Sequence, residues 1–393
     1  MDVKRIYLDW NATAPMLPEA RDAMIEALSG VHGNASSVHH EGQVARTVIE
    51  RARRAVATAV GAKAQSVVLT GGATESNNQV LRHHIVEHAR PSLVSSAVEH
   101  PSVMEVVREL GQKEVPCVVW PVDSRGRLDL AWLRARFVEA AAEDSQLASP
   151  TMVSVMWANN EVGNVYPIDE IAALVHEFGA LLHVDATQAL GRVPVDFEAA
   201  GVDLMALSFH KMGGPKGIGA IVAREGLKIE ATLAGGHQER GRRPGTENVP
   251  AAAGLSGALK ALAEQGEAWG EALRKKRAVF LEALAEQSIE YELRGDLENH
   301  LPNTLNVAFK GIDGEDLLLA LDLEGVSASS GSACTAGSLE PSHVVLAMGF
   351  EERDARRSVR FSFGPSTPEE DLVEAAKRVG VLVTRLSGYA AQG

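Results

Sequence analysis

ALLHVDATQ (180–188) and DLMALSFHKMGGPKGIG (203–219) are the two stretches that decide the fold class. Each starts with a short apolar run that indicates a buried strand and continues into polar residues. Four similar runs precede them in the chain: SVVLT (66–70), SLVSS (92–96), PCVVW (116–120) and TMVSVMW (151–157). Helical patterns separate most of these runs, and this alternation predicts an α/β fold with a mostly parallel sheet covered on both faces.

Polar residues gather directly after the predicted strands. They form five clusters: GGATES (71–76), VEHP (98–101), ANNE (158–161), DATQ (185–188) and FHK (209–211). Ligands of open α/β sheets bind beyond the carboxyl ends of the strands, so we expect these clusters to surround one site.

The pattern changes at about residue 255. A long helical run rich in Ala, Glu and Lys comes first, and a mixture of strand-like and helical runs follows it. This second block predicts a smaller α+β domain. We therefore predict a large domain over residues 16–255 and a smaller one made of 1–15 and 256–393.

The composition excludes several classes of protein. With 45% hydrophobic and 23% charged residues, the 393-residue chain is typical of a globular protein. A net charge of −14 argues against nucleic-acid binding, which needs dense Lys and Arg. The N-terminus has no apolar signal segment, no apolar stretch is long enough for a membrane span, and two cysteines indicate a reducing compartment. We expect a cytoplasmic enzyme without a membrane or nucleic-acid partner.

Lys211 follows a predicted strand and precedes a glycine-rich turn. A lysine in such a place is desolvated, which lowers its pKa and makes the amine a nucleophile toward carbonyls. Schiff-base chemistry with pyridoxal phosphate (PLP) needs such an amine and a carboxylate for the pyridinium nitrogen, and Asp185 ends the neighbouring strand. The alternative is a surface lysine beside a loop and an aspartate that caps a helix.

The cluster GGATES (71–76) joins a strand to a helix. Two glycines and a helix N-terminus suit a phosphate, because backbone N–H groups and the positive end of the helix dipole face it. The spacing matches neither a P-loop nor a Rossmann motif. The alternative is an ordinary helix start capped by Thr74.

The two cysteines differ in their surroundings. Cys117 lies in a strand-like run and is expected to be a buried small hydrophobe. Cys334 lies in SSGSACTAGS (329–338), which is small and polar. Proteins normally avoid exposed free cysteines, so we interpret Cys334 as a reactive thiol on a mobile arm.

Two further patterns leave alternatives open. In SVRFSF (358–363), alternation places Arg360 opposite Val359 and Phe361, where it could clamp a carboxylate or make a structural ion pair. The spacing HHxxEH (83–88) could ligate zinc on a helix, but it lies far from the other polar clusters, and we predict no intrinsic metal site.

Taken together, these motifs resemble the cysteine desulfurases of the NifS/IscS type, which belong to class V of the PLP-dependent transferases of fold type I. The resemblance runs from Tyr7 to about Glu370, nearly the whole chain. It is carried, in the family's order, by LDWNATAP, GGATESNN, VEHPSV, NNEVG, HVDATQ, SFHKMGGPKGIG, QERGRRPGTENV and SSGSACTAGSLEPSHV. It implies a large domain with a mostly parallel seven-stranded sheet and a smaller α+β domain.

The resemblance also implies roles for individual residues. Lys211 would carry PLP, Asp185 would pair with the ring nitrogen, and His100 would stack on the ring. Arg360 would bind the substrate carboxylate, and Cys334 would be the persulfide-forming nucleophile and a possible transient iron–sulfur ligand. The remaining cofactor contacts would come from Ala73, Thr74, Asn160, Gln188, Ser208, Phe209, His210 and, across a homodimer interface, Thr246, with Asn160 also orienting the substrate.

Three residues depart from the family's usual pattern. Phe209 replaces a small residue before the His-Lys pair, His237 stands where a third glycine is usual, and Pro244 often has serine as its counterpart. These departures bear on substrate preference and rate more than on the reaction class.

The expected function is therefore conversion of L-cysteine to L-alanine with transfer of sulfur to Cys334 and then to an acceptor protein such as an iron–sulfur scaffold. Two alternatives stay open. One is another class V PLP enzyme, such as an aminotransferase or a selenocysteine lyase. The other is a PLP-fold protein that serves only as a partner-binding subunit.

Overall fold

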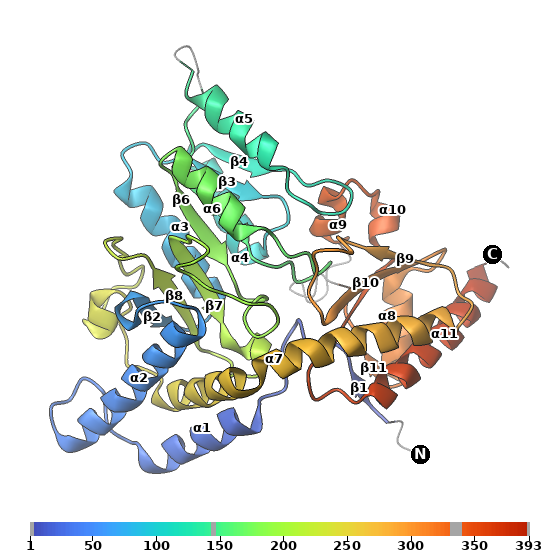
Figure 1. Cartoon of the computed structure of the whole chain (residues 1–393), viewed down its shortest axis with the longest axis horizontal. Helices are drawn as coiled ribbons and strands as arrows, with labels where there is room; N and C mark the ends of the chain where they lie inside the picture. Colours follow the sequence, from blue (N-terminus) through green and yellow to red (C-terminus); the bar gives the residue numbers. More distant parts are fainter. Residues whose placement is uncertain (1–3, 143–146, 331–339, 391–393) are drawn as a thin grey trace.

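A seven-stranded sheet forms the centre of the computed structural model, which describes residues 4–142, 147–330 and 340–390 (Figure 1). Its strands, in spatial order, are β2 (Val67–Thr70), β8 (Gly219–Ala223), β7 (Leu204–Ser208), β6 (Leu181–Asp185), β5 (Met152–Met156), β3 (Leu93–Ser96) and β4 (Cys117–Trp120). Strands β7, β6, β5, β3 and β4 run parallel to one another. The predicted α/β fold class is confirmed.

Strand β8 is the one member of this sheet that the apolar runs did not reveal. It pairs antiparallel with both β2 and β7. The run GAIVA is short and follows the glycine-rich turn after Lys211 directly, without the helix that separates parallel strands. The strand predictions depended on apolar runs separated by helical patterns, and no helical pattern separates this run from the strand before it.

Helices cover both faces of the sheet, as its apolar strands require. Successive side chains of a strand point to opposite faces. Thus Val67 and Leu69 pack on one side, with helices α2 (His40–Ala59), α5 (Leu130–Ala140), α6 (Ile168–Glu177) and α7 (Val249–Ala285). Val68 packs on the other side, with α3 (Ala73–Glu87) and α4 (Pro101–Gln112). Helix α1 (Pro18–Gly30) lies along α7 (Figure 1).

The C-terminal part builds a second core around a smaller sheet. Strands β12 (Ser358–Ser362), β10 (Thr304–Phe309) and β9 (Tyr291–Arg294) form an antiparallel sheet, and β1 (Ile6–Tyr7) pairs parallel with β11 (Val326–Ser327). The C-terminal part also contains helices α8 (Gly314–Leu323), α9 (His343–Ala347), α10 (Glu352–Ala355) and α11 (Glu369–Ala390), and of these α9 buries Val344 in the core of the large sheet.

Residues near the N-terminus belong to this second core. The side chains of Ile6, Leu8 and Trp10 are buried among those of β10, β12 and α11. This packing agrees with the expected grouping of residues 1–15 with the C-terminal part, although α7 runs through the expected boundary at residue 255. The domain division itself stays a prediction. Within the described ranges, no helix combines the length and the apolar character needed to cross a membrane.

Candidate active site

A cavity of about 980 Å³ opens at the carboxyl ends of the parallel strands. It is lined by residues from all five polar clusters found in the sequence, and the N-terminal segment and Arg360 close its other side. Of the predicted site residues, those that line it are Ala73, Thr74, His100, Asn160, Asp185, Gln188, Ser208, His210, Lys211 and Arg360.

The turn before α3 forms one end of this cavity. Gly72 is the N-cap residue with a φ of 153°, a conformation that favours glycine, and no described side chain caps the helix. Thr74 lies beyond the cap, inside the first turn, so the alternative of an ordinary Thr-capped helix is wrong. Gly219 of β8 packs against this turn, since a Cβ there would lie 2.5 Å from the Cα of Gly72. The helix N-terminus therefore faces the cavity with its backbone N–H groups available for an anion.

Asp185 lines the cavity from the end of β6. Its Oδ1 accepts a hydrogen bond from the Thr187 amide over 3.0 Å, and its Oδ2 accepts one from Asn77 Nδ2 over 2.8 Å. Asn77 Nδ2 also donates to Ser102 Oγ over 2.9 Å. The carboxylate is thus held in one orientation from both of its oxygens.

His100 is the N-cap residue of α4 and lines the same cavity as Asp185. The Ser102 amide donates to His100 Nδ1 over 3.1 Å, and Ser102 Oγ lies 2.9 Å from the same nitrogen. Burial lowers the pKa of His100, and the neighbouring positive charge of Lys211 acts in the same direction. An uncharged imidazole with a fixed ring plane suits stacking on a flat ring.

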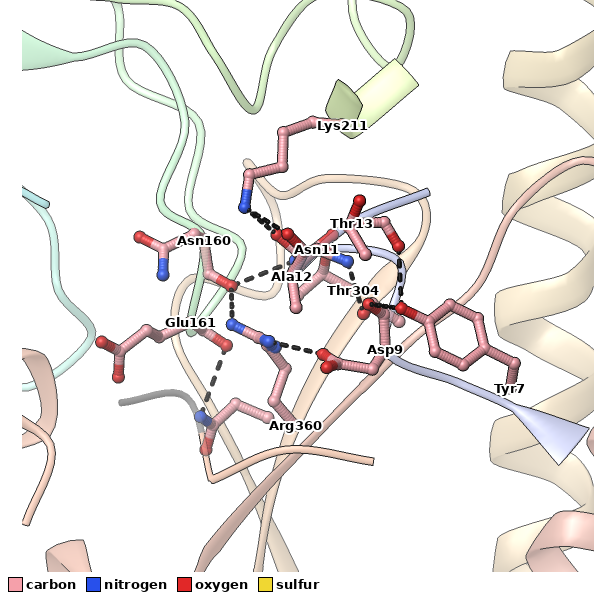
Figure 2. A network of polar contacts seen from close by, with 12 residues as sticks. Tyr7, Asp9, Asn11, Ala12, Thr13, Asn160, Glu161, Lys211, Thr304 and Arg360 are labelled. Carbon is pink, nitrogen blue, oxygen red and sulfur yellow. Dashed lines mark hydrogen bonds and ion pairs between the residues drawn. The ribbon is translucent and has the colours of Figure 1, made fainter. Parts of the chain in front are cut away.

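The Lys211 amine points across the cavity to the N-terminal segment (Figure 2). Lys211 Nζ donates to the backbone carbonyls of Asn11, over 2.7 Å, and Ala12, over 2.8 Å. Lys211 itself lies in a short 3₁₀ turn (Phe209–Met212) directly after β7. The lysine is therefore partly buried and faces the cavity, and the interpretation of a surface lysine is wrong.

Arg360 makes the structural ion pair that was one of its two open interpretations, and it also lines the cavity. Its side chain is 2% exposed, and its NH2 group lies 2.7 Å from Asp9 Oδ1 in an ion pair. Its NH1 group donates to the Asn160 carbonyl over 3.0 Å. The same guanidinium lines the cavity, where a substrate carboxylate could meet it (Figure 2).

Gln188 is held by an arginine that sequence analysis did not single out. Arg192 NH1 donates to Gln188 Oε1 over 2.6 Å, and Arg192 NH2 donates to the Lys211 carbonyl over 3.0 Å. Burial and the nearby Arg360 lower the pKa of Arg192 to about 9. Gln188 Nε2 donates to the Asn11 carbonyl over 3.0 Å.

Two predicted residues, Phe209 and Thr246, stand apart from this cavity, and a third lies outside the described residues. Phe209 is fully buried in the core, and Thr246 is exposed in the loop before α7; neither is among the residues that line the cavity. Cys334 lies outside the described residues, which resume at residue 340. Ser329, shortly before it in the sequence, exchanges two backbone hydrogen bonds with Arg360, over 3.1 and 2.6 Å.

Cys117 and the histidines of residues 83–88 lie outside the cavity, in parts of the fold that pack against other elements. Cys117 is half-buried on the edge strand β4, and burial raises the pKa of its thiol. The ring of His84 is buried beside Thr151, with Nε2 2.8 Å from the hydroxyl. Within the described parts of the chain, no group of three His, Cys, Asp or Glu side chains could hold a metal ion.

The family model for aminotransferase class V matches residues 6–374 of this chain. A cysteine desulfurase of Gluconacetobacter diazotrophicus is 41% identical over 371 residues, which span 93% of this chain and 90% of the relative. This chain belongs to the cysteine desulfurases of aminotransferase class V. Among solved structures, a NifS-like protein matches with a TM-score of 0.88 and 32% identity over 97% of this chain and all of the other. SspA in complex with cysteine matches with a TM-score of 0.78 and 27% identity over 92% of this chain and all of SspA.

Membership of this family implies PLP dependence, and the cavity of this cysteine desulfurase fits that cofactor. An uncapped helix N-terminus, a buried carboxylate and a lysine amine are the three groups that a phosphate, a pyridinium nitrogen and an aldehyde need. Sequence analysis missed four residues that hold the side chains or backbone of this site: Asp9, Asn11, Asn77 and Arg192. Asp9 and Asn11 lie in the family segment LDWNATAP and Asn77 lies in GGATESNN, and those two segments were the available signal.

Proposed function

We propose that this cysteine desulfurase converts L-cysteine to L-alanine and passes the sulfur, as a persulfide, to an acceptor protein. The observation that carries the proposal is the meeting of Lys211, Asp185 and Arg360 in one cavity. An amine, an acidic group for a pyridinium and a carboxylate clamp are together what a PLP enzyme acting on an amino acid requires.

Several residues would hold PLP in this cavity. Lys211 would bind it covalently, the N-terminus of α3 with Ser208 and His210 would bind the phosphate, and Asp185 would bind the ring nitrogen. Bound PLP supplies an electron-withdrawing ring that stabilises negative charge at the substrate Cα. Burial lowers the pKa of His210 to about 4, and the charge of Lys211 contributes, so His210 can meet a phosphate as a neutral donor.

The substrate would be placed by Arg360 and Asn160. Arg360 would pair with the carboxylate of L-cysteine, and the fixed guanidinium would turn the Cα–H bond toward Lys211. The Lys211 amine would then take the Cα proton as a general base. The hydrogen bonds from Asn77 and Thr187 would keep Asp185 in place throughout.

Cys334 would be the sulfur nucleophile. Its thiolate would attack the substrate sulfur, the bond between that sulfur and the substrate Cβ would break with its electron pair going to Cβ, and Cβ would take up a proton to become the methyl group of alanine. The sulfur would stay on Cys334 as a persulfide. An acceptor such as an iron–sulfur scaffold would then take it, and Cys334 could ligate the cluster in passing. We propose the reducing cytoplasm as the setting for this thiol chemistry.

A homodimer would complete each site. Thr246 is exposed on the loop after the buried Glu239 and does not line the cavity of its own chain. We propose that it reaches the phosphate of the partner subunit, as the family resemblance implies.

The test is turnover of L-cysteine by the purified full chain, loaded with PLP and supplied with a thiol reductant. Alanine and sulfide should appear in equal amounts, and Lys211→Ala should abolish both together with the visible absorption of the holoenzyme. A 2-oxo acid that keeps its sulfur, formed without alanine or sulfide, would indicate an aminotransferase. No product from a correctly folded, PLP-loaded protein would leave only a partner-binding role and would contradict the proposal.

A further inference from the structure

Asn11 is only 1% exposed and takes part in hydrogen bonds through its amide, its side chain and its carbonyl (Figure 2). Its Nδ2 donates to the Asn160 carbonyl over 3.1 Å and to Thr304 Oγ1 over 2.9 Å. Its Oδ1 accepts from Asn303 Nδ2 over 3.2 Å, and its amide donates to Ser362 Oγ over 3.0 Å. These contacts hold Asn11 from the loop after β5, from β10 and from β12 at once.

The backbone held in this way is the part that Lys211 contacts. The Asn11 carbonyl accepts from Lys211 Nζ over 2.7 Å, and the next carbonyl, that of Ala12, accepts from it over 2.8 Å. Lys211 follows Asn11 by 200 residues, so no local geometry produces the contact. Carbonyl oxygens stabilise an ammonium group, because hydrogen bonds to a charged donor are stronger than neutral ones.

We propose that the carbonyls of Asn11 and Ala12 are a resting site for the Lys211 amine whenever it is not bonded to the cofactor, and that Asn11 is the positioning residue that fixes this site. The proposal rests on the proposed function, in which Lys211 gives up its bond to PLP in every turnover. At the resting site the amine stays at the cavity that Lys211, Asn11 and Ala12 line together.

The side chain of Asn11 matters for this resting site because the carbonyls of Asn11 and Ala12 must both point at Lys211 Nζ. Asn11 and Ala12 lie in a turn in which the amides of Ala12 and Thr13 donate to the Asp9 carbonyl, over 3.1 and 3.4 Å, and contacts from outside this turn fix where its carbonyls lie relative to Lys211. Asp9, two residues earlier, is tied to Arg360, and Thr13, two residues later, has its hydroxyl 3.1 Å from His210 Nδ1. Asn11 lies between Asp9 and Thr13 in the sequence. Its side-chain contacts therefore act on the same residue whose carbonyl accepts from Lys211.

The reactivity of Lys211 in the cofactor-free full chain tests this proposal. A trace of acetic anhydride is added at a fixed pH, and mass spectrometry measures acetylation of Lys211 relative to Lys216. Lys216 lines the same cavity but is exposed, and it serves as an internal reference. An amine held by two carbonyls has its lone pair occupied by a proton, so Lys211 should react more slowly than Lys216 in the parent protein.

Asn11→Ala should raise the Lys211-to-Lys216 ratio by about tenfold, the size expected when hydrogen bonds to a charged group are weakened. Asn11→Ser, which retains one polar group, should raise it less. The matched control is Asn164→Ala, because Asn164 is equally buried and makes side-chain hydrogen bonds to Arg125 and Asp296 instead. Its ratio should stay at the parent value while its melting temperature falls.

Three results would overturn the proposal: Lys211 as reactive as Lys216 in the parent, an unchanged ratio in both Asn11 variants, or the same rise in Asn164→Ala. The labelling uses neither cysteine nor PLP. A failure of the chain to turn over cysteine would therefore contradict the proposed function without affecting this readout.

Discussion

Asn77 and Asp185 are 108 residues apart in the sequence, and the Asn77 side chain donates to Asp185 Oδ2 over 2.8 Å. The same amide nitrogen donates to Ser102 Oγ, which lies 2.9 Å from His100 Nδ1. One side chain of α3 thus connects the carboxylate proposed for the ring nitrogen with the imidazole proposed for the ring face. The positions of these two groups therefore depend on each other as well as on the sheet.

This connection predicts that Asn77→Ala weakens PLP binding by about tenfold or more. Loss of the amide leaves Asp185 Oδ2 buried without its partner, which costs about 1–3 kcal/mol, and each 1.4 kcal/mol is a factor of ten in affinity. Asn77→Asp should bind PLP more weakly still, since a second carboxylate would face Asp185. An absorbance titration of the cofactor-free variants with PLP measures both, and tight binding by Asn77→Asp would contradict the assignment of Asp185.

The contact between Gly219 and Gly72 predicts that a larger residue at position 219 weakens PLP binding at the N-terminus of α3, where the phosphate is proposed to bind. A Cβ at Gly219 would lie 2.5 Å from the Cα of Gly72 and 2.6 Å from the Leu207 carbonyl, so Gly219→Ala must push the start of α3 away. We expect at least tenfold weaker PLP binding and a lower melting temperature. The control is Gly111→Ala on α4, where a Cβ would have no neighbour within 4 Å.

That control should keep parental PLP affinity and gain up to about 1 kcal/mol of stability from helix propensity. Equal affinities in the two variants would mean that the approach of β8 to the turn before α3 does not shape the cavity.

The buried histidines predict that stability falls as the pH is lowered. Burial lowers the pKa of His183 to about 4, while an unfolded chain has the ordinary value near 6.5. Between these values the unfolded state binds a proton that the folded state does not, so the stabilisation is complete above pH 6.5 and is lost toward pH 4. His183 alone should contribute on the order of 1–2 kcal/mol of this loss by pH 5.

Urea unfolding of the cofactor-free protein at pH 8 and pH 5 measures the effect. His183→Gln should make the difference in unfolding free energy between the two pH values smaller. His40, an exposed histidine at the start of α2, gives the control variant His40→Gln, which should leave that difference unchanged. An equal pH dependence in parent and His183→Gln would contradict a neutral His183.

Part of this site could be predicted because its chemistry lies at strand ends. The apolar runs before Asp185 and Lys211 located two neighbouring parallel strands, and the rule on carboxyl ends then placed both residues at one cavity. Alternation in β12 likewise predicted that Arg360 faces away from Val359 and Phe361, whose side chains are buried in the second core.

The supporting contacts could not be predicted, because they join segments that no pattern connects. Asp9 meets Arg360 across 351 residues of chain, and Asn77 meets Asp185 across 108. Each needs the assembled fold before its partner is defined. The start of α3 shows a different limit: Thr74 is a good capping residue by type, but the close approach of Gly219 makes Gly72 the cap and puts Thr74 inside the helix.

The central claim is that Cys334 takes the sulfur, and a single-turnover measurement tests it most directly. PLP-loaded Cys334→Ser is mixed with L-cysteine, and alanine and protein-bound persulfide are quantified beside the parent and Cys117→Ser. Serine retains the shape of cysteine, but its hydroxyl is too weakly acidic to attack sulfur at neutral pH. We predict cysteine-dependent spectral changes in Cys334→Ser with almost no alanine and no persulfide, and parental values for Cys117→Ser. Alanine formation by Cys334→Ser at the parental rate would show that this thiol has no part in the reaction and would contradict the account.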